Sequence, residues 1–182
     1  MPPPLERLGD IALHFPLHGA LREAKPYGSG HINDTFLTCF NHAGAQVRYI
    51  LQRINHRVFK NVPQLMENIS RVTLHLAGTT AATGHRRTLT LVPTLGGKPF
   101  HETPAGEFWR VYLFIEGART YDRVESPRQA FEAARAFGLF QRALADLAGR
   151  RRGRMAPMPQ LCARPLGSHW QGHPHAGRKK LS

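Results

Sequence analysis

The stretch YGSGHINDTF, Tyr27 to Phe36, sets two glycines in front of a run of β-branched and aromatic residues that continues to Phe40. Such residues favour strands. YILQRIN, Tyr49 to Asn55, indicates a returning strand, and LMENISRVTLHL, Leu65 to Leu76, has its apolar residues at helical spacing. The order predicts a hairpin with a glycine loop at its entrance, followed by a helix.

One helix is expected before this hairpin and one after it. LERLGDIALHF, Leu5 to Phe15, has apolar residues on one helical face and is expected to pack at the edge of the sheet. The helix after the hairpin can begin at Asn61 or at the Val62-Pro63 step, because proline is accepted in a first helical turn. Gly78 is expected to end it.

The second half of the chain predicts more strands and a third helix. Leu89 to Val92 and Phe108 to Ile115, on either side of a Gly96-Gly97 turn, indicate two or three antiparallel strands. Ser126-Pro127 is a capped helix start, and an apolar stripe follows it as far as Leu147. That stripe predicts a helix that packs against a partner surface.

The formal charge of +13 over 182 residues is concentrated at one end. Ala148 to Ser182 contains eight Lys or Arg and no Asp or Glu, and it has no apolar periodicity, so we expect this C-terminal segment to be disordered. Either an out-of-frame translation of a GC-rich gene or a natural basic arm that binds RNA or anionic lipid would explain it, although Trp170 is its single stacking aromatic residue. Its Cys and His residues match no strong zinc template: Cys162, His169, His173 and His175.

Cysteine use and hydropathy indicate a cytoplasmic protein. Cys39 and Cys162 are too few for a disulfide framework. No apolar run approaches the roughly 20 residues that span a bilayer, and the start MPPPLERLGD lacks the basic-then-apolar order of a secretion signal. We expect no membrane partner.

The glycine loop is a candidate phosphate site, because glycines let backbone N–H groups approach phosphate oxygens closely. The candidate residues are Gly28, Ser29, Gly30, His31 and Asn33. Two glycines alone are a weak signal, since Asn33 stands where the third glycine of G-x-G-x-x-G would be. The strand and helix that follow strengthen the interpretation.

A cation on the third strand is expected to reach the phosphates, held by a carboxylate on the following helix. Only one of Gln52 and Arg53 can face the nucleotide, because side chains alternate along a strand. Arg53 is favoured, since a neutral amide cannot neutralise phosphate, and Glu67 is the only acid between Leu65 and Leu76. Glu116, in FWRVYLFIEG, is expected to offer main-chain groups to adenine at a hinge.

The chain resembles the aminoglycoside phosphotransferase-type, kinase-like family, in particular its N-acetylhexosamine 1-kinase-like branch. The resemblance covers about Leu17 to Leu147. It is carried by GHINDTF (Gly30 to Phe36), YILQRIN (Tyr49 to Asn55), LMENI (Leu65 to Ile69), LTLVPT (Leu89 to Thr94), WRVYLFIEGARTYD (Trp109 to Asp122) and AARAFGLFQRALADL (Ala133 to Leu147).

The resemblance implies an enzyme that uses ATP and magnesium to phosphorylate a sugar hydroxyl. It also implies a catalytic Asp in an H-x-D loop, an Asn five residues on and a magnesium-binding Asp, all on a C-terminal lobe. This sequence has no histidine followed two residues later by Asp, and no carboxylate after Asp146. We therefore expect the N-terminal lobe only, truncated, without catalytic or metal-binding residues, binding nucleotide weakly and inactive alone.

The expected fold class is α+β, a kinase-like N-terminal lobe built from a twisted antiparallel sheet with a packed helix. Residues 1–20 lead in, 21–117 form the lobe, 118–147 are hinge and linker helix, and 148–182 are the basic segment. The predicted function is the nucleotide-binding lobe of a sugar-kinase-like phosphotransferase, with a sugar acceptor only if the missing lobe is present. The alternatives are a small basic nucleic-acid-binding protein that acts through residues 148–182, and a degenerate interaction module.

Overall fold

The computed structural model describes residues 3–83, 88–118 and 121–147, all within one compact unit, Met1–Leu147. The C-terminal segment, with its expected disorder and its candidate zinc residues, lies outside the described residues. Its described residues form three helices, α1 (Leu5–Ala12), α2 (Val62–Thr83) and α3 (Pro127–Ala143). Its strands are β1 (Ala20–Pro26), β2 (Asp34–His42), β3 (Ala45–Ile54), β4 (Leu91–Val92), β5 (His101–Glu102) and β6 (Phe108–Leu113).

The strands form one antiparallel sheet in the order β1-β2-β3-β6-β4, with β5 paired to β6. The expected α+β class is confirmed, and so is the expected order of glycine loop, strand, strand and helix. β2 and β3 are joined by a two-residue turn in which Ala43 and Gly44 both have positive φ, 48° and 87°. That turn matches the right-handed twist of a hairpin and favours glycine at its second position.

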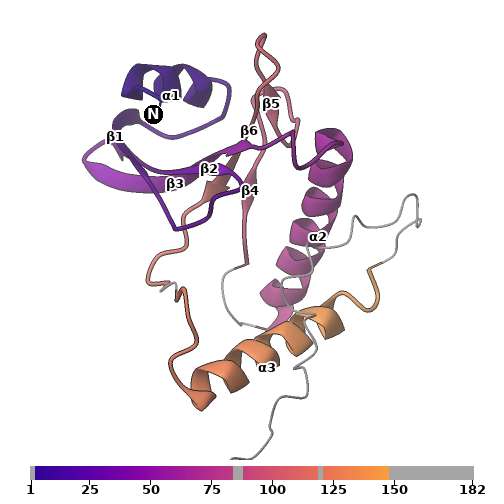
Figure 1. The fold of residues 1–182 in the computed structure, drawn as a ribbon. Coiled ribbons are helices and arrows are strands. Elements are labelled where there is room, and N and C mark those ends of the chain that lie inside the picture. Colours follow the sequence, from indigo (N-terminus) through magenta and orange to yellow (C-terminus); the bar gives the residue numbers. More distant parts are fainter. Residues whose placement is uncertain (1–2, 84–87, 119–120, 148–182) are drawn as a thin grey trace, which may run out of the picture. The chain divides into compact units, whose positions relative to one another are not determined.

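Helix α1 packs on one face of the sheet (Figure 1). Its Leu8 and Ile11 are buried against aromatic and aliphatic side chains of β2, β3 and β6. The sheet residues of this cluster are Phe36, Phe40, Tyr49, Leu51, Trp109 and Val111. The helix also contacts β1, the edge strand, so it covers this face near the sheet edge, which agrees with the prediction. Alternating side chains on adjacent strands make the wide apolar face that the helix covers.

Helix α2 packs on the other face, near the end of β3. Met66 is fully buried with Val62 and Ile54, and Phe108 of β6 packs against them. Asn61 caps the helix, since its Oδ1 accepts a hydrogen bond from the backbone N–H of Gln64 at 3.0 Å. The prediction that Gly78 ends the helix was wrong, because α2 continues to Thr83. A glycine inside a helix costs only about 1 kcal/mol relative to alanine, which the rest of a long helix tolerates.

Helix α3 begins as predicted. The Ser126 hydroxyl accepts a hydrogen bond from the backbone N–H of Gln129, and Pro127 occupies the first turn. The helix ends at Ala143, earlier than the predicted Leu147, and none of its residues is buried. Phe131 and Phe137 are more than half exposed. Within the described residues the predicted partner surface for this stripe is therefore not found.

Across the ranges that the structure describes, no helix combines the length and the apolar character that crossing a membrane requires.

The α2 packing gives a matched pair of substitutions on one helix. Met66→Ala is expected to lower the free energy of unfolding by about 2–5 kcal/mol, because it removes most of a fully buried side chain and leaves a cavity in its place. Leu74→Ala, at a position that is 73% exposed, is expected to change it by less than about 0.5 kcal/mol. Urea denaturation followed by circular dichroism measures both. Equal losses for the two variants would contradict the packing described.

Candidate functional site

The face of the sheet that α2 covers holds an array of alternating β3 and β6 side chains. Gln52 is directly opposite Arg110 in the β3–β6 register, and Ile50 is opposite Tyr112. Residues two apart on a strand share a face, so these four side chains lie on the same face as Ile54, which packs against α2. We call this surface the α2 face.

Arg110 and Gln52 form the polar centre of the α2 face. The Gln52 Oε1 accepts hydrogen bonds from Arg110 Nε at 2.9 Å and from Arg110 Nη2 at 2.6 Å. The Gln52 Nε2 donates in turn to Thr35 Oγ1 of β2 at 2.6 Å. Arg110 is only 9% exposed, and burial lowers its pKa from the ordinary value. Gln52 thus fixes the orientation of a buried guanidinium.

Arg53 lies on the opposite face of the sheet. Its Nε donates to Asp34 Oδ2 at 2.7 Å and its Nη1 donates to Glu107 Oε1 at 2.8 Å. Its guanidinium carbon is 5.9 Å from the centre of the Trp109 ring, which belongs to the α1 core. The prediction that Glu67 holds Arg53 was wrong, since Asp34 and Glu107 hold it. Strand alternation turns Gln52, and not Arg53, toward α2.

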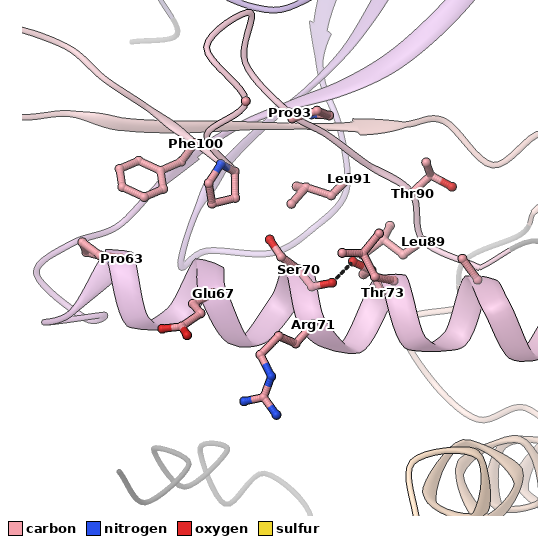
Figure 2. A pocket seen from close by; sticks show the side chains of 14 residues that line it. Pro63, Glu67, Ser70, Arg71, Thr73, Leu89, Thr90, Leu91, Pro93 and Phe100 are labelled. Carbon is pink, nitrogen blue, oxygen red and sulfur yellow. Dashed lines mark hydrogen bonds between the residues drawn. The ribbon is translucent and has the colours of Figure 1, made fainter. Parts of the chain in front are cut away.

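Glu67 is exposed on α2 and lines a cavity of about 600 Å³ between that helix and residues 89–100. Figure 2 shows Glu67 and Arg71 directed away from Leu91 and Phe100. The remaining lining is mainly apolar and small polar side chains: Pro63, Ser70, Thr73, Leu74, Ala77, Leu89, Thr90, Pro93, Gly97 and Pro99. Among the predicted site residues, this lining contains Glu67 alone.

The glycine loop between β1 and β2 has an exposed and open backbone. Gly28 has φ of +82°, a conformation that other residues rarely adopt, and a Cβ added at Gly28 or Gly30 would have no heavy atom within 4 Å. The loop is closed at its base, where the Tyr27 N–H donates to the Thr35 carbonyl at 2.9 Å. His31 is exposed and lies within the same loop. The loop therefore has room for a ligand above its backbone.

Asn33 ties the end of the glycine loop to the end of β3. Its Oδ1 accepts a hydrogen bond from the Asn55 backbone N–H at 2.9 Å. The side-chain oxygen is therefore occupied in holding the loop, and the amide nitrogen is the part of this residue that remains for a ligand.

The glycine loop lies beside the segment that follows β6. Ser29 Oγ donates to Asp122 Oδ1 at 2.6 Å, and the rings of Tyr27 and Phe114 meet edge to face with centroids 5.8 Å apart. In the same segment, the Glu116 carboxylate accepts hydrogen bonds from Arg48 of β3, from Nε at 2.9 Å and from Nη2. The structure thus brings together the predicted loop and the predicted hinge.

Arg110 was not among the residues predicted from the sequence. The prediction looked for a cation on the third strand, but the buried cation of the α2 face comes from β6. One sequence signal could have found it. Within FWRVYL, Arg110 stands between the buried Trp109 and Val111, and a charge inside such an apolar strand has to be oriented by a specific partner.

No family model matches this chain. A similar solved structure is that of a spectinomycin phosphotransferase in complex with ADP and spectinomycin, at 13% sequence identity and a TM-score of 0.47. The match covers 82% of this chain and 40% of the phosphotransferase chain, so this chain spans less than half the length of that structure. An identity and a TM-score this low assign neither a substrate nor site residues to this chain.

The stability that Glu107 contributes through its ion pair with Arg53 is expected to depend on pH. Burial alone would raise its pKa, but hydrogen bonds from Trp109, Arg53 and Arg7 outweigh burial and hold the pKa below the ordinary value. A carboxyl whose pKa is lower when folded stabilises the protein above its unfolded pKa, about 4.3, and this contribution is lost as the pH falls through the folded pKa. We expect Glu107→Gln to be less stable than wild type at pH 7, with the difference shrinking below about pH 4.3.

Urea denaturation between pH 3 and pH 7 measures this dependence. Glu102→Gln is the matched control, because Glu102 is an exposed carboxylate on the neighbouring strand β5. Its substitution is expected to change the free energy of unfolding by less than about 0.5 kcal/mol throughout. A constant difference between wild type and Glu107→Gln at every pH would contradict the argument.

Proposed function

We propose that residues 21–117 act as the nucleotide-binding lobe of a phosphotransferase that resembles ATP-dependent sugar kinases. The observation that carries this proposal is the meeting of two segments far apart in the sequence. The open glycine loop, through Ser29 and Tyr27, contacts the segment after β6, through Asp122 and Phe114. A loop for phosphates beside a hinge for a base is the arrangement that a nucleotide requires.

The glycine loop would bind the phosphates through its main chain. Gly28, Ser29, Gly30 and His31 present backbone N–H groups on an exposed loop with no side chain crowding either glycine. Successive backbone N–H groups make a concave site for anions. Asn33 supports this role indirectly, because its bond to Asn55 fixes the end of the loop.

The hinge would bind adenine through main-chain atoms near Glu116. The Glu116 carboxylate is already engaged by Arg48, so the side chain positions the segment and leaves its N–H and C=O groups for a base. Leu37 and Ile50 belong to the same face of the sheet as Gln52 and would provide apolar contact for the adenine ring. Gln52 is thus the β3 member of the site in place of Arg53.

Phosphoryl transfer needs groups beyond these. Within the described residues, no group of three or more His, Cys, Asp or Glu side chains could hold a metal ion. The sequence also lacks the H-x-D pattern that supplies the catalytic base in such enzymes. We therefore propose that this chain binds nucleotide weakly, that it does not transfer phosphate by itself, and that the sugar acceptor requires a second lobe.

A residue-resolved NMR titration with ATP tests the proposal. We expect ATP to shift the backbone signals of residues 27–33 and of residues 114–117 in the full chain. Gly30→Val should weaken this binding by about tenfold or more without unfolding the protein, because the side chain has open space in the free loop but occupies the path of the phosphates.

Gly96→Ala is the control, since Gly96 is in another loop and an added Cβ would make only an ordinary contact of 3.9 Å with Thr94. It should leave ATP binding unchanged. The proposal fails if ATP shifts no signal of the glycine loop, or if Gly30→Val binds ATP as well as wild type does.

A further inference from the structure

Among the three arginines of β3 and β6, Arg110 is the one with no carboxylate partner among the described residues. Arg53 pairs with Asp34 and Glu107, and Arg48 pairs with Glu116. The Arg110 guanidinium donates to the neutral Gln52 Oε1 and to the Met66 Sδ, at 3.5 Å from Nη1, and it also interacts with the side chain of Tyr112, which is not a carboxylate. Yet Arg110 is the most deeply buried of the three arginines, at 9% exposed.

A buried cation without a counter-charge is energetically unfavourable unless an anion completes the site. A guanidinium has five N–H donors. One amide oxygen occupies two of them in Arg110, and a thioether sulfur, which is a weak acceptor, faces a third. With the Tyr112 contact also counted, donor capacity remains for an oxygen of an oxyanion.

The surroundings of Arg110 connect it to the glycine loop. Gln52 joins Arg110 to Thr35, and the Thr35 carbonyl accepts the hydrogen bond from Tyr27 that closes that loop. The centre of the Tyr112 ring lies 5.2 Å from the guanidinium carbon, and the Tyr112 side chain also hydrogen-bonds with Arg110. The Arg110 guanidinium is thus on the same face of the sheet as Leu37 and Ile50, and its strand β6 pairs directly with β3.

We propose that Arg110, oriented by Gln52, is the phosphate-binding cation of this lobe and takes a phosphate group of a nucleoside di- or triphosphate. This inference rests on the proposed nucleotide-binding function. Arg110 touches the phosphate, whereas Gln52 is a positioning residue whose neutral amide holds the guanidinium without neutralising it. A carboxylate at position 52 could accept the same hydrogen bonds from Arg110, although it could not donate to Thr35, and it would cancel the charge that a phosphate needs.

Arg110→Met tests the cation, and Arg53→Met is its matched control. Both replace an arginine of the central strands by an apolar side chain of similar length, but on opposite faces of the sheet. In NMR titrations of the full chain, ATP is expected to bind Arg110→Met about tenfold or more weakly than wild type, the loss typical of one charge-assisted hydrogen bond. Arg53→Met should bind ATP as wild type does, and adenosine, which has no phosphate, should bind all three proteins equally.

Gln52→Glu tests the positioning role. We expect it to weaken ATP binding as strongly as Arg110→Met while adenosine binding is unchanged, a difference that mere loss of structure would not produce. Arg110→Lys, which keeps the charge but not the planar fork, should retain part of the ATP affinity and serves if Arg110→Met does not fold. Backbone NMR spectra establish the fold of each variant.

The outcomes separate this inference from the proposed function. If ATP binds wild type and Arg110→Met equally, the inference is overturned and the nucleotide-binding function stands. If tripolyphosphate shifts the Arg110 Nε–H signal while ATP leaves the glycine loop unchanged, an anion site exists and the nucleotide-binding function is overturned. If neither ATP nor tripolyphosphate shifts that signal in the wild-type chain, the inference is overturned, and the proposed function is overturned with it when ATP also leaves the glycine loop unchanged.

Discussion

The antiparallel register that sets Leu51 opposite Val111 constrains the rest of this structure. Because side chains alternate along each strand, this single pairing sends Leu51, Val111 and Trp109 toward α1, and sends Gln52, Arg110 and Ile54 toward α2. A shift of β3 by one residue would turn Arg53 toward α2 and Gln52 toward α1, and would break both arrangements. The apolar cores on both faces therefore fix the register of β3 and β6, and this register places Gln52 and Arg110 on the α2 face.

The arginines on the two faces of the sheet have different partners. On the α1 face, Arg53 is half-exposed and its charge is balanced by Asp34 and Glu107, so hydrogen bonds to these carboxylates raise its pKa although burial opposes them. On the α2 face, Arg110 is buried beside a neutral amide, and burial lowers its pKa. The charge of Arg53 is paired within the fold, whereas the proposed phosphate site uses the charge of Arg110, whose partners among the described residues are neutral.

The glycine loop is distinguished from an ordinary surface turn by its contacts with a distant segment of the chain. Its open backbone would be a common surface turn if it stood alone, but contacts from Ser29 and Tyr27 bring it to the segment after β6, more than 80 residues along the chain. Arg48 holds the same segment through Glu116. The loop, the hinge and the α2 face are thus parts of one arrangement, and the proposed site consists of main-chain groups from the first two and a buried cation from the third.

The sequence by itself determined the helices, the main strands and the glycine loop, because their signals are local: helical spacing after Asn61, a capping Ser126 and the β-branched run to Phe40. It did not indicate β1, whose charged residues form a strand through pairing with β2. Nor could it choose between Gln52 and Arg53 or find Arg110. Only the tertiary structure decided these points, because the face that a strand residue occupies depends on distant partners, and a buried charge is recognised only by the groups around it.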